Sequence, residues 1–151
     1  MRTYLVIIDD TAEASAALRF ATRRANRTGG AVQLLALVPP QPFSAFGAVQ
    51  ATIEAEARQH AEGLLAGAAG NVLSEGANVP KISVMVGEGV KVVREYMAEH
   101  QEVSALVLGA ATEGGPGPLV AHFSGAGAGQ LPCPLYIIPG SLSEAEIDRL
   151  S

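Results

Sequence analysis

The sequence predicts an α/β protein, a single domain built on a five-stranded parallel sheet with helices on both faces. Short, uninterrupted apolar runs alternate with longer segments of helical periodicity. Runs of this kind are typical of strands buried on both faces, and the alternation is typical of strands joined by helices through right-handed crossovers. In such sheets, ligands bind beyond the carboxyl ends of the strands, where the strand order reverses.

Composition restricts the class of protein. A chain of 151 residues, 48% of them hydrophobic, is long enough to enclose one core. The formal net charge of −5 disfavours nonspecific binding to nucleic acid. The single cysteine, Cys133, cannot form an internal disulfide, and no apolar run is long enough to cross a membrane. The chain turns acidic too early for a signal peptide, so we expect a cytoplasmic protein.

The start of the chain predicts the first strand and helix. The β-branched run at residues 4–8 is typical of a strand, and it stops at a pair of aspartates. Asp10 and Glu13 have the spacing of a capping box, so the first helix should begin near Thr11. The Thr-Gly-Gly sequence at residues 28–30 should end it.

A row of arginines marks this helix. Arg19, Arg23 and Arg27 recur at every fourth position, with Arg24 beside them. Such a row is typical of a solvated helix surface, and an anion-binding face is the less favoured interpretation.

The second strand, residues 32–38, should end at Pro39-Pro40. Two aromatic residues, Phe43 and Phe46, follow in a loop. Aromatic side chains beyond a strand end can cover a pocket, or they can pack against the edge of the core. Both interpretations stay open.

A long helix is predicted over residues 49–74. Apolar residues at steps of three or four form its expected buried face: Ile53, Ala57, Ala61, Leu64, Ala68 and Val72. His60 has no partner at ligand spacing, so we expect a surface side chain and not a metal ligand.

The third strand, residues 81–86, alternates apolar and polar side chains, which predicts a place nearer the sheet edge. Gly87-Glu88-Gly89 then forms a turn. The helix that follows should bury Val90, Val93, Tyr96 and Met97. The fourth strand is expected at residues 104–108.

The best candidate site is the stretch from residue 106 to 138. It begins as a strand, breaks at Gly109 into a loop rich in Gly and Pro, and ends as a strand at 135–138. A Gly-rich turn before a helix can direct backbone N–H groups at an anion. The alternative, which we favour, is a tight crossover whose glycines let helix and sheet approach closely.

The motifs of common enzymes are missing from the sequence. There is no phosphate-binding loop ending in Gly-Lys-Ser/Thr, no Gly-x-Gly-x-x-Gly after the first strand and no Gly-x-Ser-x-Gly elbow. No cysteine pair or close histidine pair suggests zinc. Ser124, His122 and Asp9 could meet as a hydrolytic set, but a triad needs a rigid surrounding that a Gly-rich segment does not give. We therefore predict no catalytic residue and no metal, and we favour a protein without enzymatic activity over an enzyme.

Over residues 1–139 the sequence resembles the universal stress protein family. The matching segments, in order, are YLVIIDDTAEASAALRFATRRA, LLALVPP, VGEGVKVVREYMAEH, ALVLGAAT and LPCPLYIIP. The resemblance implies the strand order 3-2-1-4-5 and a dimer, often formed by pairing of the last strands. In nucleotide-binding members it implies ATP or a related adenine nucleotide at the carboxyl ends of the strands.

The resemblance also implies a ligand site. Asp9 matches the acidic residue that ends the first strand of the binders, and Gly109 matches the first glycine of their loop motif. Thr112 stands at the second glycine, and the closing pair falls within residues 121–123, where no Gly-Ser or Gly-Thr stands. The phosphate half of the motif is therefore degraded. The predicted ligand-binding residues are Asp9, Val38, Gly109, Thr112, His122 and Ser124, with Phe43 and Phe46 as a cover.

The chain divides into a universal stress protein domain, residues 1–140, and a short helical tail, residues 141–151. Ser143 and Glu146 have capping-box spacing in the tail, which should dock through Ile147 and Leu150 on its own subunit or on the second subunit of the dimer.

We predict a stress-response regulator that acts as a homodimer through strand 134–138, together with an unidentified protein partner, without ordinary ATP binding. Neither nucleic acid nor membrane is an expected partner, and no cofactor is expected. The alternative is a protein that binds an adenine nucleotide such as ATP, or another small ligand, with the altered loop 109–125, and hydrolyses it slowly.

Overall fold

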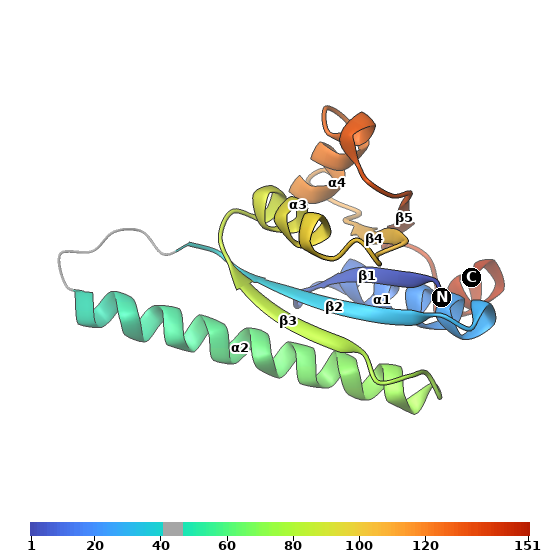
Figure 1. The fold of residues 1–151 in the computed structure, drawn as a ribbon, viewed down its shortest axis with the longest axis horizontal. Helices are drawn as coiled ribbons and strands as arrows, with labels where there is room; N and C mark the ends of the chain where they lie inside the picture. Colours follow the sequence, from blue (N-terminus) through green and yellow to red (C-terminus); the bar gives the residue numbers. More distant parts are fainter. Residues whose placement is uncertain (41–46) are drawn as a thin grey trace.

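The computed structural model describes residues 1–40 and 47–151, with residues 47–50 described by their helical backbone alone. It contains one sheet of five parallel strands in the order β3-β2-β1-β4-β5 (Figure 1). The strands are β1 (Thr3–Ile8), β2 (Ala31–Val38), β3 (Lys81–Val86), β4 (Ala105–Ala110) and β5 (Leu135–Pro139). The predicted sheet and strand order are confirmed.

Helices cover both faces of the sheet, as predicted. They are α1 (Ala12–Thr28), α2 (Gly47–Ser74), α3 (Gly89–Glu99), α4 (Pro118–Ser124) and α5 (Glu144–Leu150), with a 3₁₀ turn η1 at Ala128–Gln130. One core cluster joins α1, α2 and α5 to the sheet, and a second joins α3 and α4 to its other face. Figure 1 shows α2 and α3 on opposite sides of the strands.

The central strand explains the uninterrupted apolar run at the start of the chain. All six residues of β1 are buried. Tyr4, Val6 and Ile8 enter one core cluster, and Leu5 and Ile7 enter the other. At the sheet edge, β3 leaves Ile82 51% exposed, so the edge position predicted for this strand is confirmed.

The start of α1 differs from the prediction. Thr11, not Asp10, is the N-cap: its backbone is extended and its hydroxyl accepts a hydrogen bond from Ala14 N at 3.2 Å. The Asp9 carboxylate accepts hydrogen bonds from the backbone N–H of Thr11, at 2.9 Å, and from its hydroxyl. The Asp10–Glu13 capping box is therefore wrong, because the next residue along already supplies the cap. Gly29, with φ of 67°, ends the helix as predicted.

The long helix α2 buries fewer residues than its periodicity predicted. The face that enters the core is formed by Ala61, Leu65, Ala68 and Val72. Ile53 is 46% exposed, and Leu65 rather than Leu64 is fully buried. The 28 residues of α2 span about 42 Å, whereas the 8 residues of β2 span about 27 Å. The first turns of the helix consequently extend past the strands (Figure 1).

The tail forms α5, which docks on α1. Ser143 caps the helix, and Ser143 and Glu146 form the predicted capping box. Ile147 is 2% exposed and belongs to the core, whereas Leu150 is 52% exposed and does not dock on its own subunit. The helix is only two turns long, and it turns a single one of these two side chains toward α1.

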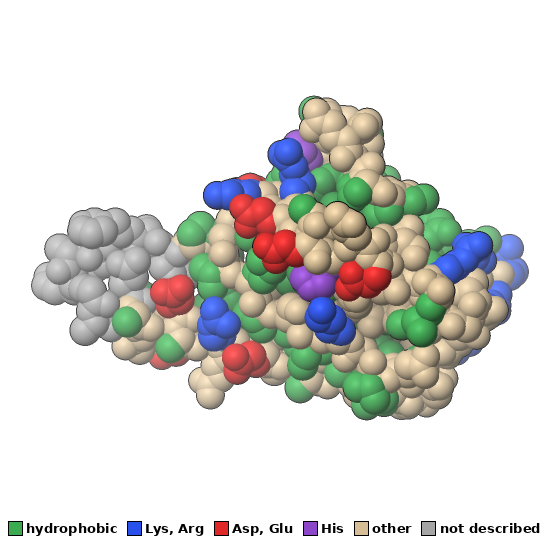
Figure 2. All heavy atoms as spheres, in the orientation of Figure 1, with side chains coloured by type: hydrophobic (Ala, Val, Ile, Leu, Met, Phe, Trp, Pro, Cys, Tyr) green, Lys and Arg blue, Asp and Glu red, His purple; other side chains and the backbone are tan. Residues whose placement is uncertain are grey.

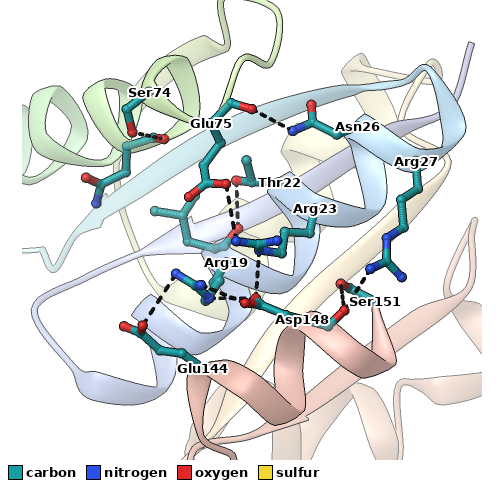
Figure 3. A network of polar contacts seen from close by, with 12 residues as sticks. Arg19, Thr22, Arg23, Asn26, Arg27, Ser74, Glu75, Glu144, Asp148 and Ser151 are labelled. Atoms are coloured by element: carbon teal, nitrogen blue, oxygen red, sulfur yellow. Dashed lines mark hydrogen bonds and ion pairs between the residues drawn. The ribbon is translucent and has the colours of Figure 1, made fainter.

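The arginine row of α1 is the other half of this contact (Figure 3). Arg19 forms two hydrogen bonds of 2.8 Å to the Asp148 carboxylate. Arg23 Nε lies 2.6 Å from the same carboxylate as an ion pair without directed hydrogen-bond geometry, and Arg27 donates to the Asp148 carbonyl at 2.8 Å. The predicted solvated surface is therefore wrong, because the row binds α5.

Candidate functional site

A cavity of about 420 Å³ lies at the carboxyl ends of β1 and β4. Those two strands flank the point where the strand order reverses, which is where ligands bind in sheets of this type. Its apolar wall comes from both strands, from the end of β2 and from the starts of α3 and α4, and includes Ile7, Leu37, Val90, Leu108 and Leu119. With Glu13 and Ala14 of α1, the site is therefore built from six elements that meet at one edge of the sheet.

The structure brings two of the predicted site residues together. Asp9 and Gly109 both line the cavity. Val38 is only 1% exposed, and its neighbours Leu37 and Pro39 line the cavity in its place. Successive side chains of a strand point to opposite faces, so the last residue of β2 enters the core while the one before it faces the site.

The remaining predicted residues lie elsewhere. Thr112 is exposed in the loop and does not line the cavity. His122 lines a separate cavity of about 210 Å³ beside Arg94, and the Ser124 hydroxyl donates to Val120 O at 2.6 Å. The meeting of Ser124, His122 and Asp9 that a hydrolytic set would require therefore does not occur. Phe43 and Phe46, the predicted cover, fall outside the described residues.

Glu13 is a residue of the cavity that the sequence analysis missed. A Cβ added to Gly109 would lie 2.0 Å from Glu13 O and 2.9 Å from Glu13 Cβ. A Cβ added to Gly140 would lie 3.1 Å from Glu13 Cβ. Neither glycine has a positive φ, so each is required for space and not for its backbone conformation. The favoured interpretation of Gly109, a close crossover of helix and sheet, fits this contact.

Glu88 is a second acidic residue of the cavity. It caps α3, and its two carboxylate oxygens accept hydrogen bonds of 3.0 Å from Lys91 N and Val90 N. These two donors lower the pKa of the Glu88 carboxyl, so the side chain is ionised at neutral pH. Glu13 and Glu88 could both have been found from the sequence, because each stands at the start of a helix that follows a strand.

The loop before α4 supplies the remaining wall. Gly114, Gly115 and Gly117 have φ of 71°, 88° and 100°, a region that side chains rarely adopt. Pro116 and Pro118 line the cavity on either side of Gly117, and neither carries a backbone N–H. The glycines therefore shape the turn, and the two prolines offer no N–H donor to an anion at their own positions.

Within 1–40 and 47–151, no group of three or more His, Cys, Asp or Glu side chains is arranged to hold a metal ion. In the same part of the chain, no helix combines the length and apolar character needed to cross a membrane.

The fold and the position of the cavity define a doubly wound α/β domain of nucleotide-binding type. Residues 1–139 match the Universal stress protein family. The chain therefore belongs to this family, and the resemblance noted in the sequence is confirmed. No protein of curated function matches the chain in sequence.

Solved structures of the family share the fold at low sequence identity. UspA from Lactobacillus plantarum is 19% identical, with a TM-score of 0.79 over 91% of this chain and 97% of that one. A universal stress protein in complex with cAMP is 19% identical, with a TM-score of 0.66 over 93% and 98%. An Arabidopsis thaliana family member with AMP bound is 12% identical, with a TM-score of 0.63 over 92% of each chain.

Proposed function

We propose that this protein is a cytoplasmic stress-response regulator that acts as a homodimer through residues 134–138 and does not bind ATP in the ordinary way. The observation that carries the second part is the charge of the cavity. Asp9, Glu13 and Glu88 line it, and none of its described lining residues is Lys, Arg or His. Triphosphate binding needs convergent N–H groups or cations to offset its charge.

The position of β5 supports the homodimer. This strand lies at the edge of the sheet and pairs only with β4 among the described strands. It is also partly open to solvent, with Ile137 40% exposed. An apolar edge strand tends to associate unless it is covered, and pairing with its own copy about a twofold axis covers it.

A regulator of this kind acts on another protein, and the surface charge supports such a partner over nucleic acid. Figure 2 shows acidic and basic side chains interspersed across the middle of one face of the molecule. Nonspecific binding to nucleic acid depends instead on positive charge that neutralises phosphates, and the net charge here is −5.

Adenine-nucleotide binding is the second candidate function. It is favoured by the place of the cavity, at the strand ends beside Asp9, and by the relatives whose structures contain cAMP and AMP. In this alternative the altered loop 109–125 would surround the phosphates, with slow hydrolysis as a further activity.

Titration calorimetry with ATP and Mg²⁺ at neutral pH separates the two functions. We expect weak or no binding, with a Kd no tighter than about 1 mM, which corresponds to about 4 kcal/mol. Asp9→Ala is the matched variant, because Asp9 lines the cavity and matches the family's acidic residue. Micromolar affinity that Asp9→Ala abolishes would place the protein among the nucleotide binders.

A further inference from the structure

The arginine row of α1, formed by Arg19, Arg23 and Arg27, holds α5 mainly through charge (Figure 3). Arg19 donates from Nε and Nη2 to the two carboxylate oxygens of Asp148, both at 2.8 Å, and Arg27 donates to the Asp148 carbonyl. Ile147 is the buried side chain of the helix. The row thus recognises a helix that carries a carboxylate beside one apolar side chain.

The helix α5 is an addition to a sheet that is complete without it. The residues that match the family end at 139, and all five strands and helices α1 to α4 lie before α5. Its seven residues are too few for a stable helix alone, because isolated helices shorter than about 12 residues are marginal in water. Release of α5 therefore breaks no strand pairing, and the released segment loses the contacts that keep it helical.

The row is not fully satisfied by α5. Asp148 directs both of its carboxylate oxygens at Arg19. Arg23 Nη2 pairs with Glu75 at 3.5 Å, but its buried Nε lacks a hydrogen bond among the described residues. Arg27 donates to a carbonyl, and no ion pair within the described residues joins it to a carboxylate. Because buried donors without acceptors are costly, a helix with more carboxylates would fit the row better than α5 does.

We propose that the arginine row is a docking site for an acidic amphipathic helix of a partner protein, and that α5 occupies this site until the partner displaces it. The helix that fits carries a carboxylate, then an apolar side chain and a second carboxylate three and four residues on, as Glu144, Ile147 and Asp148 do. A third carboxylate at the position of Ser151 would lie beside Arg27, because both residues now donate to Asp148 O. The proposal rests on the proposed function, because it assigns a chemistry to the protein partner of the regulator.

A peptide of residues 140–151 with an N-terminal fluorophore tests whether the row binds such a helix from another molecule. Fluorescence anisotropy measures its binding to the full chain. In the unmodified protein the tethered α5 competes at an effective concentration of about 1 mM. Asp148→Arg sets a cation against the row and releases α5, so this variant should bind the peptide at least about tenfold more tightly.

The matched control is Glu99→Arg, which makes the same charge change on α3, a helix that covers the other face of the sheet. This variant should bind the peptide as weakly as the unmodified protein does. A peptide of the same composition in permuted order should not bind Asp148→Arg. Circular dichroism melts check that each variant folds, and Asp148→Asn takes the place of Asp148→Arg if that variant does not.

Two further changes test the chemistry of the contact. Arg19→Gln, added to Asp148→Arg, should weaken peptide binding by about tenfold or more, because it removes a charged, bidentate donor. Arg58→Gln, at an exposed position of α2, is the control and should leave binding unchanged. A peptide that carries Ser151→Asp should bind about threefold more tightly than the natural peptide.

Each opposite result overturns a stated part of the proposal. Equal affinities of Asp148→Arg and Glu99→Arg overturn displacement of α5, and Arg19→Gln that acts like Arg58→Gln overturns docking on the row. A Ser151→Asp peptide that binds no tighter overturns the inference that the row is unsatisfied. Assembly that Asp148→Arg abolishes and Ile137→Glu leaves intact would assign the row to the tail of a second copy.

These results are distinct from those that bear on the proposed function. A peptide that does not bind overturns the docking site while the regulator without ordinary ATP binding still stands. Micromolar ATP binding that needs Asp9 overturns the proposed function and leaves the peptide measurements unaffected, because Asp9 lines the cavity at the strand ends and not the contact between α1 and α5.

Discussion

At the residue scale, Gly109 and Gly140 determine how closely α1 approaches the ends of β4 and β5. Glu13 O occupies the space where a side chain on Gly109 would begin. Both positions carry ordinary backbone conformations, so the missing side chain is what matters in each. The shape of the site therefore depends on the absence of side chains at Gly109 and Gly140 as well as on the carboxylates that line it.

Gly109→Ala should destabilise the fold by about 1–3 kcal/mol or more, because an added methyl group overlaps backbone that cannot move freely. Gly63→Ala is the control. Gly63 lies inside α2 with no atom within 4 Å of an added Cβ, so alanine should stabilise the helix by about 0.5–1 kcal/mol. Urea denaturation of the two variants measures both effects. Equal changes in the free energy of unfolding would contradict the close-contact interpretation.

The candidate site could be predicted only in part at this scale. Asp9 and Gly109 were found because parallel strands bring their carboxyl ends to one edge. Glu13 was missed because its spacing from Asp10 fits a capping box, which gave it a structural role in place of a role in the cavity. Spacing alone does not show whether Asp10 or the adjacent Thr11 is the N-cap. His122 was misplaced because the direction of α4 depends on three positive-φ glycines, whose torsions no periodicity reveals.

At the element scale, α5 and α1 are joined by one carboxylate that receives two arginines. Hydrogen bonds from Arg19 hold the pKa of the Asp148 carboxyl below its ordinary value, and Arg19 and Arg23 add attraction through their charges. The pKa of this carboxyl is near 3.8 in the unfolded chain and lower in the folded protein. The ion pair therefore stabilises the fold fully at a pH above 3.8, and this stabilisation is lost as the pH falls through the folded-state pKa. The docking of α5 is therefore sensitive to acid below about pH 4.

Asp148→Asn should lower the melting temperature at neutral pH, because it removes the charge that Arg19 and Arg23 share. The difference from the unmodified protein should shrink as the pH falls below about 4, where Asp148 is itself protonated. Glu144→Gln is the control: this side chain is 80% exposed and 3.7 Å from Arg19, so its loss should have little effect. Thermal melts across the acid range test the prediction, and a difference that stays constant with pH would refute it.

The elements themselves were largely predictable, whereas their contacts were not. Periods of two and of three to four residues located the strands and the helices. The arginine row was interpreted as solvated because its partner, Asp148, lies 129 residues beyond Arg19 in the chain. The overhang of α2 was missed because periodicity reveals which side of a helix is apolar but not how far the neighbouring sheet extends.

At the scale of the whole molecule, we expect the β5 edge of the sheet to form the dimer and the β3 edge to take no part in it. Ile137 on β5 and Ile82 on β3 are both exposed apolar residues, 40% and 51% respectively. Ile137→Glu should raise the Kd of the proposed dimer by about tenfold or more, because like charges would meet across the twofold axis. Ile82→Glu should leave assembly unchanged. Light scattering at tens of micromolar protein measures the assembly state. An unmodified protein that is monomeric at that concentration would contradict the prediction.

The strand order also has a consequence for how the chain folds. The first strand to be synthesised, β1, ends up at the centre of the sheet, between β2 and β4. Its pairing with β2 joins neighbours in sequence, but its other edge waits for β4: Thr3 N donates to Ser104 Oγ across 101 positions of the chain. Contacts of such long separation slow folding and leave an apolar strand edge open during synthesis. Nascent chains that lack β4 are therefore the form of this protein with most need of a chaperone.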